Sequence, residues 1–83
     1  GTNVEIYDSD FHGLDPTLRN VSDPTQAKEV VIGDNVFIGS NCKILKGVSV
    51  GNNSVLANAS VVVGSIPANV IAGGNPAKVI RNL

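Results

Sequence analysis

Residues 8–15 contain the only histidine of the chain, His12, together with three carboxylates, Asp8, Asp10 and Asp15. An imidazole with its ordinary pKa of about 6.5 is largely neutral at pH 7 and can take a proton from a hydroxyl group. A carboxylate or backbone carbonyl on the other ring nitrogen would stabilise the imidazolium that forms. His12 is therefore a candidate general base, and any of the three aspartates could orient it. The alternative is a solvated loop histidine bound to one of them.

Length and composition limit the other chemistry. At 83 residues the chain forms at most one small domain, whose stability is marginal unless oligomerisation or another constraint adds to it. One cysteine, Cys42, excludes an internal disulfide and a cysteine-pair metal site. A zinc site of three histidines is not readily built from one histidine per chain. We therefore expect no metal, which argues against a metal hydrolase.

The charges are unevenly distributed along the chain. All seven acids lie in residues 1–34 with two bases, whereas residues 35–83 carry four bases and no acid. The C-terminal half suits an anionic ligand, but four scattered cations and three aromatic residues do not indicate a nucleic-acid partner. No apolar run approaches the roughly 20 residues of a membrane span, and no signal peptide is visible. We expect a cytoplasmic protein without a membrane partner.

Aliphatic residues recur every six positions from Ile32 onward. A period of six fits neither a helix nor a simple strand, and it predicts short strands joined by tight corners. Three such units make one triangular coil of a parallel β-helix. Glycine or asparagine is expected at corners that need a positive φ. The recurring residues are Ile32, Ile38, Ile44, Val50, Leu56 and Val62.

The period also predicts how the coils stack. Residues 18 apart should lie one above the other, so that Ile32 stacks under Val50, Ile38 under Leu56 and Ile44 under Val62. A second column of small or β-branched residues should face inward four positions after each aliphatic residue, with Cys42 packed in the core. This second column comprises Val36, Cys42, Val48, Ser54, Ser60 and Ile66.

The remaining segments lack this rhythm, and we expect a single β-helix domain over residues 1–83. Residues 1–7 form a strand of an incomplete coil, and residues 8–29 form the loop that carries His12. Residues 30–67 supply two coils, and residues 68–83 form a short C-terminal cap. Long loops without secondary structure in compact domains are usually functional or disordered. Two coils alone are near the limit of stability, which favours a trimer or a longer parent chain.

Three stretches of the sequence resemble one family of enzymes. "HGLDPTLRN" at residues 12–20 resembles the His-Pro-Leu-Asp-Pro-x-x-Arg-Asn loop of the maltose and galactoside O-acetyltransferases. "IGDNVFIGSN" and "GGNPAKVIRNL" resemble their hexapeptide repeats and C-terminal segment. The resemblance implies an all-β, left-handed parallel β-helix and a homotrimer. It also implies transfer of acetyl from acetyl-CoA to a hydroxyl of a sugar or similar acceptor, with His12 as general base.

The resemblance further implies where acetyl-CoA binds. Ser40 matches a serine near the thioester, and Asn58 lies one coil further along the same line. Lys78 and Arg81 match basic positions near the nucleotide phosphates, on one face of a short C-terminal helix or turn. Gly74, with Gly73, would let the backbone approach a ligand. The alternatives are an ordinary solvated C-terminus and a plain Gly-Gly-Asn-Pro turn.

The chain departs from the family pattern at several positions. Val63-Gly64 replace Thr-Lys, and Phe37 replaces tryptophan. Asn58 replaces a small alanine that lets pantetheine lie against the coil. We therefore expect weakened affinity for CoA. The family's N-terminal helical segment and early coils would precede Gly1. The alternative function is accordingly a non-catalytic, truncated β-helix that serves as a trimerisation or binding module.

Overall fold

The chain folds as a stack of triangular coils built from very short strands. The computed structural model describes residues 1–7 and 28–83, and all regular elements within these ranges are strands. Loop residues 8–27, with His12, lie outside the described residues. The strands are β1 (Glu5–Ile6), β2 (Val31–Ile32), β3 (Phe37–Ile38), β4 (Lys43–Ile44), β5 (Ser49–Val50), β6 (Val55–Leu56), β7 (Val61–Val62), β8 (Val70–Gly74) and β9 (Ala77–Asn82).

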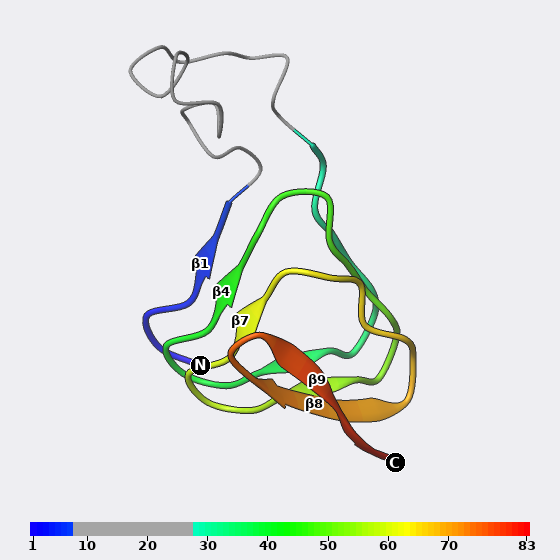
Figure 1. Ribbon diagram of the computed structural model, residues 1–83. Helices are drawn as coiled ribbons and strands as arrows, with labels where there is room; N and C mark the ends of the chain where they lie inside the picture. The colour runs from blue at the N-terminus through cyan, green and yellow to red at the C-terminus, as the bar shows by residue number, and fades with distance from the viewer. Residues whose placement is uncertain (8–27) are drawn as a thin grey trace, which may run out of the picture.

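Three sheets form the sides of the triangle (Figure 1). One has the order β1-β4-β7, the second pairs β2 with β5, and the third has the order β3-β6-β8-β9. All pairs are parallel except β8 with β9. Seen along the axis, the chain runs clockwise as it approaches the viewer (Figure 1), so the β-helix is left-handed, unlike most parallel crossovers. The predicted fold class is confirmed.

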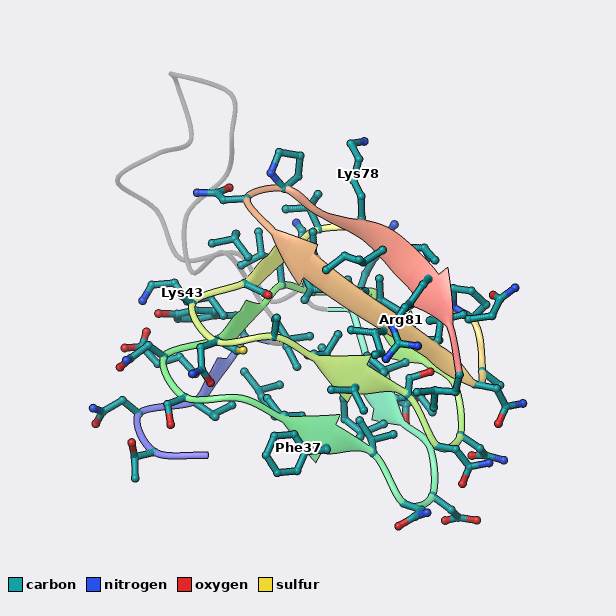
Figure 2. All side chains as sticks on the ribbon, turned by 90° about the horizontal axis from the view of Figure 1, so that it is seen from below. Phe37, Lys43, Lys78 and Arg81 are labelled. Atoms are coloured by element: carbon teal, nitrogen blue, oxygen red, sulfur yellow. The ribbon has the colours of Figure 1, made fainter. Side chains whose placement is uncertain are left out.

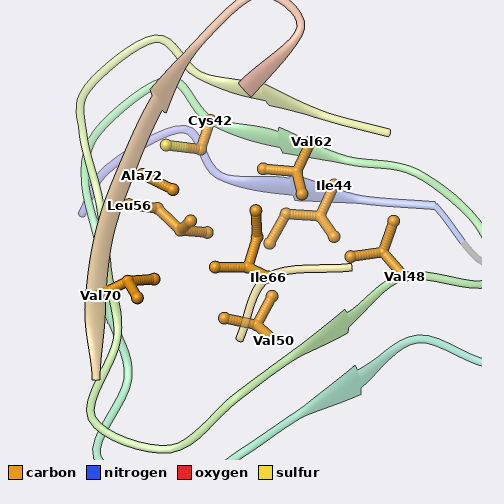
Figure 3. Close-up of a cluster of buried hydrophobic side chains, with 9 residues drawn as sticks. All are labelled: Cys42, Ile44, Val48, Val50, Leu56, Val62, Ile66, Val70 and Ala72. Atoms are coloured by element: carbon orange, nitrogen blue, oxygen red, sulfur yellow. The ribbon is translucent and has the colours of Figure 1, made fainter. Parts of the chain in front are cut away.

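The strand register confirms the predicted stacking. Ile32 pairs with Val50, Ile38 with Leu56, and Ile44 with Val62. The aliphatic residues fill the axis of the triangle (Figure 3), and Ile44, Leu56 and Val62 are fully buried. The second inward column is buried as well at Cys42, Val48, Ser54 and Ser60. Ile32 and Ile38 are only partly buried, because no described strand lies beneath β2 or β3.

Polar side chains in the interior are satisfied within the coils. The Ser54 hydroxyl donates to the Pro67 carbonyl at 2.6 Å, and the Ser60 hydroxyl donates to the Ala57 carbonyl at 2.6 Å. The Cys42 thiol donates to the same Ala57 carbonyl at 3.1 Å. Because a buried hydroxyl without a partner is costly, these bonds allow serine to occupy the inward column.

The corners repeat the same backbone conformation every six residues. A positive φ occurs at Asn35, Asn41, Gly47, Asn53 and Ala59, which confirms the expectation of glycine or asparagine at the corners except at Ala59. Two of these residues also bond from coil to coil. The Asn35 carboxamide donates to Asn53 at 3.1 Å, and Asn53 donates in turn to Asn69 at 2.9 Å.

The glycines after the inward aliphatic residues serve a different purpose from the one expected. Gly33, Gly39 and Gly51 are not among the residues with positive φ. They are needed because the next coil passes directly over them. A Cβ on Gly39 would lie 2.7 Å from the Asn58 nitrogen and 2.9 Å from the Leu56 carbonyl oxygen. The close approach of backbones therefore requires glycine here.

The six-residue rhythm ends after Val62. Ile66 was expected in the second inward column, but it bridges to Val50, 16 residues earlier, and so takes the place of a strand residue. The pairing of Val55 with Ile71 in β8 has the same shorter spacing. The corner after β7 is therefore two residues shorter than the others, a change that the spacing of aliphatic residues does not reveal.

The C-terminal segment is a β-hairpin, and the expectation that Lys78 and Arg81 lie on a short helix or turn was wrong, because both lie in β9. β9 runs antiparallel to β8 and extends the third sheet (Figure 1). A helix is disfavoured because Pro76 falls in the turn and because the adjacent β-branched residues Val79 and Ile80 favour a strand.

We predict that Gly39→Ala lowers the free energy of unfolding by more than about 2 kcal/mol, because its Cβ would overlap backbone atoms of the next coil. The matched control is Gly64→Ala, whose Cβ meets nothing within 4 Å. The control should change stability by less than about 1 kcal/mol. Urea unfolding measures both, and equal effects would contradict the close-approach explanation.

We predict that Ala59→Gly raises the free energy of unfolding by about 0.5–1 kcal/mol. Ala59 has φ of 61°, a conformation that alanine adopts at a cost of about 1–2 kcal/mol and glycine without cost. Ala68→Gly, at a residue without positive φ, should instead lower stability. Destabilisation of both variants in thermal unfolding would contradict the assigned strain.

Candidate functional site

At one corner of the triangle, the residues that follow the parallel strands β3 and β6 stack with the last two residues of β8. We call residues 39–41, 57–59 and 73–74 the Ser40 corner. Backbone bonds hold these coils in register: Gly39 N–H donates to the Leu56 carbonyl at 2.8 Å, and Ala57 N–H donates to the Ala72 carbonyl at 2.9 Å. The stacking brings together segments that are distant in sequence.

Ser40 and Asn58 contact each other directly in this corner. The Ser40 N–H donates to Oδ1 of Asn58 at 2.8 Å, and the Ser40 carbonyl accepts from the Ala59 N–H at 2.8 Å. Their predicted alignment, 18 residues apart, is confirmed. Asn58 is exposed and Ser40 is half-buried.

The Ser40 hydroxyl is also bonded on its other side. Thr2 donates to Ser40 Oγ from its N–H at 3.2 Å and from its own hydroxyl at 3.3 Å. Gly1 lies in the same coil and donates to the Ile38 carbonyl at 2.8 Å. Since these two bonds use both acceptor positions of the serine oxygen, the Ser40 O–H hydrogen remains available to a ligand.

The two glycines that end β8 are required for different reasons. A Cβ on Gly73 would lie 2.9 Å from the Ala57 Cβ and 3.3 Å from Cδ1 of Ile80. Gly74 has φ of 101°, which strains any other residue. Ala57 and Ile80 already fill the Cβ position of Gly73, so of the two glycines only Gly74 has room for the expected approach of a ligand.

Lys78 and Arg81 lie on the same face of β9, although not for the predicted reason. Lys78 pairs with Gly73 and Arg81 pairs with Ile71, with an irregularity of register between these pairs. Because Gly73 and Ile71 are two residues apart on β8, they share a face, and so do their partners. In a regular strand, residues three apart would face opposite sides, so the β-bulge brings the two cations together.

Apolar side chains form a row on the outer face of the third sheet that ends at Arg81. Phe37, Val55 and Ile71 are paired in register, and Arg81 continues the row on β9. Phe37 is 62% exposed and projects from the lowest coil of this sheet, whereas Lys43 lies on a different side of the molecule (Figure 2). Sequence reasoning missed this row, although its members on β3 and β6 directly precede the inward aliphatic residues.

The described ends of the loop that carries His12 lie at a different corner. Tyr7 N–H donates to the Ile44 carbonyl at 2.8 Å, and Gly47 N–H donates to the Lys28 carbonyl at 3.4 Å. Both attachments are made beside the corner that follows β4 (Figure 1), one side of the triangle away from Ser40. His12 itself, with its candidate partners Asp8, Asp10 and Asp15, lies outside the described residues.

Polar contacts surround the start of this loop. The Tyr7 hydroxyl donates to the Glu5 carboxylate, and this hydrogen bond raises the pKa of Tyr7 above its ordinary value. Glu5 also forms an ion pair with Lys43 on the neighbouring strand at 3.9 Å. The pair is solvent-exposed and contributes little to stability.

Residues 1–7 and 28–83 contain no group of three His, Cys, Asp or Glu side chains that could hold a metal ion. None of the elements described in these ranges is a helix of the length and hydropathy that crossing a membrane requires.

The repeats match a known family. Residues 29–64 match the model described as bacterial transferase hexapeptide, six repeats. These residues belong to the hexapeptide-repeat transferase family. The resemblance predicted from the sequence is confirmed, and the hexapeptide repeats are the coils described above.

Relatives with solved structures extend the match over nearly the whole chain. A galactoside acetyltransferase in complex with coenzyme A is 39% identical with a TM-score of 0.89, covering 96% of this chain. A maltose O-acetyltransferase from Clostridium difficile is 42% identical with a TM-score of 0.87, covering 98%. A Vibrio cholerae hexapeptide-repeat acetyltransferase in complex with acetyl-CoA is 39% identical with a TM-score of 0.86, covering 96%.

The chain corresponds to only part of each relative. A Saccharomyces cerevisiae protein provisionally named an acetyltransferase is 48% identical over 81 residues, which are 98% of this chain and 40% of that protein. The three solved structures are covered over 39% to 43% of their lengths. The hexapeptide-repeat chain therefore spans about two fifths of these relatives.

Proposed function

We propose that this chain is the coenzyme-binding β-helix of an acetyl-CoA-dependent O-acetyltransferase, whose acceptor is a hydroxyl group of a sugar or a similar small molecule. The observation that carries the proposal is the match to acetyltransferases solved with acetyl-CoA or CoA, at TM-scores of 0.86 and 0.89. Two further observations support it: Ser40 and Asn58 contact each other, and Lys78 pairs with Gly73 beside Gly74.

In this proposal acetyl-CoA lies along the outside of the third sheet. The thioester end lies at the Ser40 corner, where the Ser40 hydroxyl can donate to the thioester carbonyl. The pantetheine arm passes Gly74, where a Cβ would meet only the Pro76 carbonyl oxygen, at 3.6 Å. Lys78 and Arg81 bind the nucleotide phosphates from their shared face of β9.

His12 acts as general base on the acceptor. Its imidazole takes the hydroxyl proton while the acceptor oxygen bonds to the thioester carbon, which gives a tetrahedral intermediate. The Ser40 hydroxyl stabilises the oxyanion as an electrostatic partner. The carbon–sulfur bond then breaks, the CoA thiolate leaves, and the imidazolium returns the proton to sulfur. Acetyl passes directly from sulfur to oxygen without a covalent enzyme intermediate.

The proposed site is completed by a second copy of the chain. The loop ends at Tyr7 and Lys28 emerge one side of the triangle away from Ser40. In a three-fold symmetric assembly the loop of one chain can reach the Ser40 corner of its neighbour. A homotrimer therefore reconciles the two locations, and it adds the stability that a stack of so few coils needs.

A non-catalytic trimerisation or binding module is the second candidate. Positions 63 and 64 are open to solvent, because Val63 is 53% exposed and a Cβ on Gly64 would meet nothing within 4 Å. Valine and glycine offer a ligand neither a hydroxyl nor a cation there. This candidate predicts a folded trimer that does not bind acetyl-CoA.

Calorimetric titration of acetyl-CoA into the 83-residue chain, with the oligomeric state recorded in the same buffer, separates the two candidates. We predict saturable binding of about one acetyl-CoA per subunit. Lys78→Ala combined with Arg81→Ala should weaken binding by at least about fivefold, because two phosphate contacts are lost. Lys43→Ala removes a cation on another sheet and should leave affinity unchanged. A trimer without binding at millimolar ligand would refute the coenzyme site.

We predict that His12→Ala lowers kcat by at least about 10²-fold with little change in KM for acetyl-CoA, because only proton transfer is lost. The assay follows release of CoA thiol from acetyl-CoA across a panel of sugar acceptors. Equal turnover of the variant and the unmodified chain would remove His12 from the mechanism.

A further inference from the structure

The backbone donor of Ser40 is already occupied by a side chain of the same protein. Oδ1 of Asn58 accepts the Ser40 N–H at 2.8 Å, and the Ser40 N–H is the donor nearest the Ser40 hydroxyl along the chain. Asn58 is exposed, so its carboxamide lies on the outer surface of the Ser40 corner. A ligand carbonyl that approaches this N–H from outside meets the asparagine oxygen first.

The carboxamide also fills the space above Gly39. Gly39 is buried although it has no side chain, and a Cβ there would lie 2.5 Å from Oδ1 of Asn58. The asparagine therefore removes both a hydrogen-bond donor and a volume from the surface that the acetyl-CoA proposal assigns to the thioester. A smaller residue at position 58 would return both.

We propose that Asn58 is an autoinhibitory residue of the coenzyme site: its carboxamide competes with carbonyl groups of acyl-CoA for the Ser40 N–H and sets a low affinity. The inference rests on the proposed function, because it requires acyl-CoA to bind at the Ser40 corner. Because the Asn58 oxygen belongs to the same chain, its effective concentration at the Ser40 N–H is high, and the ligand must break this hydrogen bond to bind. A water molecule on a free N–H would be displaced more readily.

The chain contains a structural duplicate of this arrangement at another corner. Oδ1 of Asn52 accepts the Asp34 N–H at 2.7 Å, and its carboxamide lies over Gly33 as Asn58 lies over Gly39. Both bonds join residues 18 apart, and both asparagines are exposed. Asn52 follows β5 and is therefore outside the Ser40 corner. Removal of the Asn52 carboxamide should therefore lower the stability of the chain to a similar extent without changing its affinity for acetyl-CoA.

The test compares Asn58→Ala, Asn52→Ala and the unmodified chain by calorimetric titration with acetyl-CoA and with CoA, together with thermal unfolding. Each variant loses one side-chain hydrogen bond, so both should show a similar decrease in Tm. Only Asn58→Ala should bind acetyl-CoA more tightly, by about three- to tenfold, the factor expected when one net hydrogen bond no longer has to be broken. Hydrogen exchange of the Ser40 amide should become faster in this variant alone.

Unchanged or weaker binding by Asn58→Ala, while the unmodified chain binds, would overturn the inference and leave the proposed function intact. Weaker binding by Asn58→Ala would show that Asn58 contacts the ligand and does not compete with it. If neither the unmodified chain nor Asn58→Ala binds acetyl-CoA or CoA, the proposed function itself fails, and this inference fails with it. Tighter binding by both alanine variants would also overturn it, because the effect would then be general loosening of the coils.

Discussion

Backbone hydrogen bonds between successive coils, which pair residues 18 apart in the sequence, are the constraint on which the rest of this structure depends. This spacing places each inward aliphatic residue over the one before it and so builds the core from residues such as Ile44 and Val62. The same close approach excludes side chains where one coil crosses another, which is why Gly33 and Gly39 have no alternative. The stacking of the core residues and the need for glycine at the corners therefore both follow from the register of the coils.

The candidate site is a third consequence of the register. Ser40 and Asn58 are neighbours only because their coils are stacked, and Gly73 joins them because β8 continues the sheet over β6. The hairpin then adds Lys78 to the same corner. No segment of the chain could form this arrangement alone, so loss of coil stacking should remove the coenzyme site together with the fold.

Much of this architecture could be predicted because a six-residue period has few physical solutions. The stacked pairs and the asparagines with positive φ follow from that period directly. The position of Ile66 could not be predicted, because a corner shortened by two residues leaves the aliphatic spacing unchanged up to Val62. The common face of Lys78 and Arg81 was expected from a helix or turn, yet a bulged strand gives the same face, and the spacing of the two residues does not distinguish these structures. The outer row through Phe37 was not predicted, because the period of six identifies only the residues that face inward.

Backbone amide NMR during titration with CoA reports where on the coils the ligand binds. We predict that the largest shift changes fall at Gly39, Ser40, Asn58, Gly73 and Lys78. Little change is expected at Asn35, Asn53 and Asn69, the asparagine ladder on the corner between the second and third sheets. Changes centred on that ladder, or an absence of saturable changes, would contradict the assignment of the Ser40 corner as the coenzyme site.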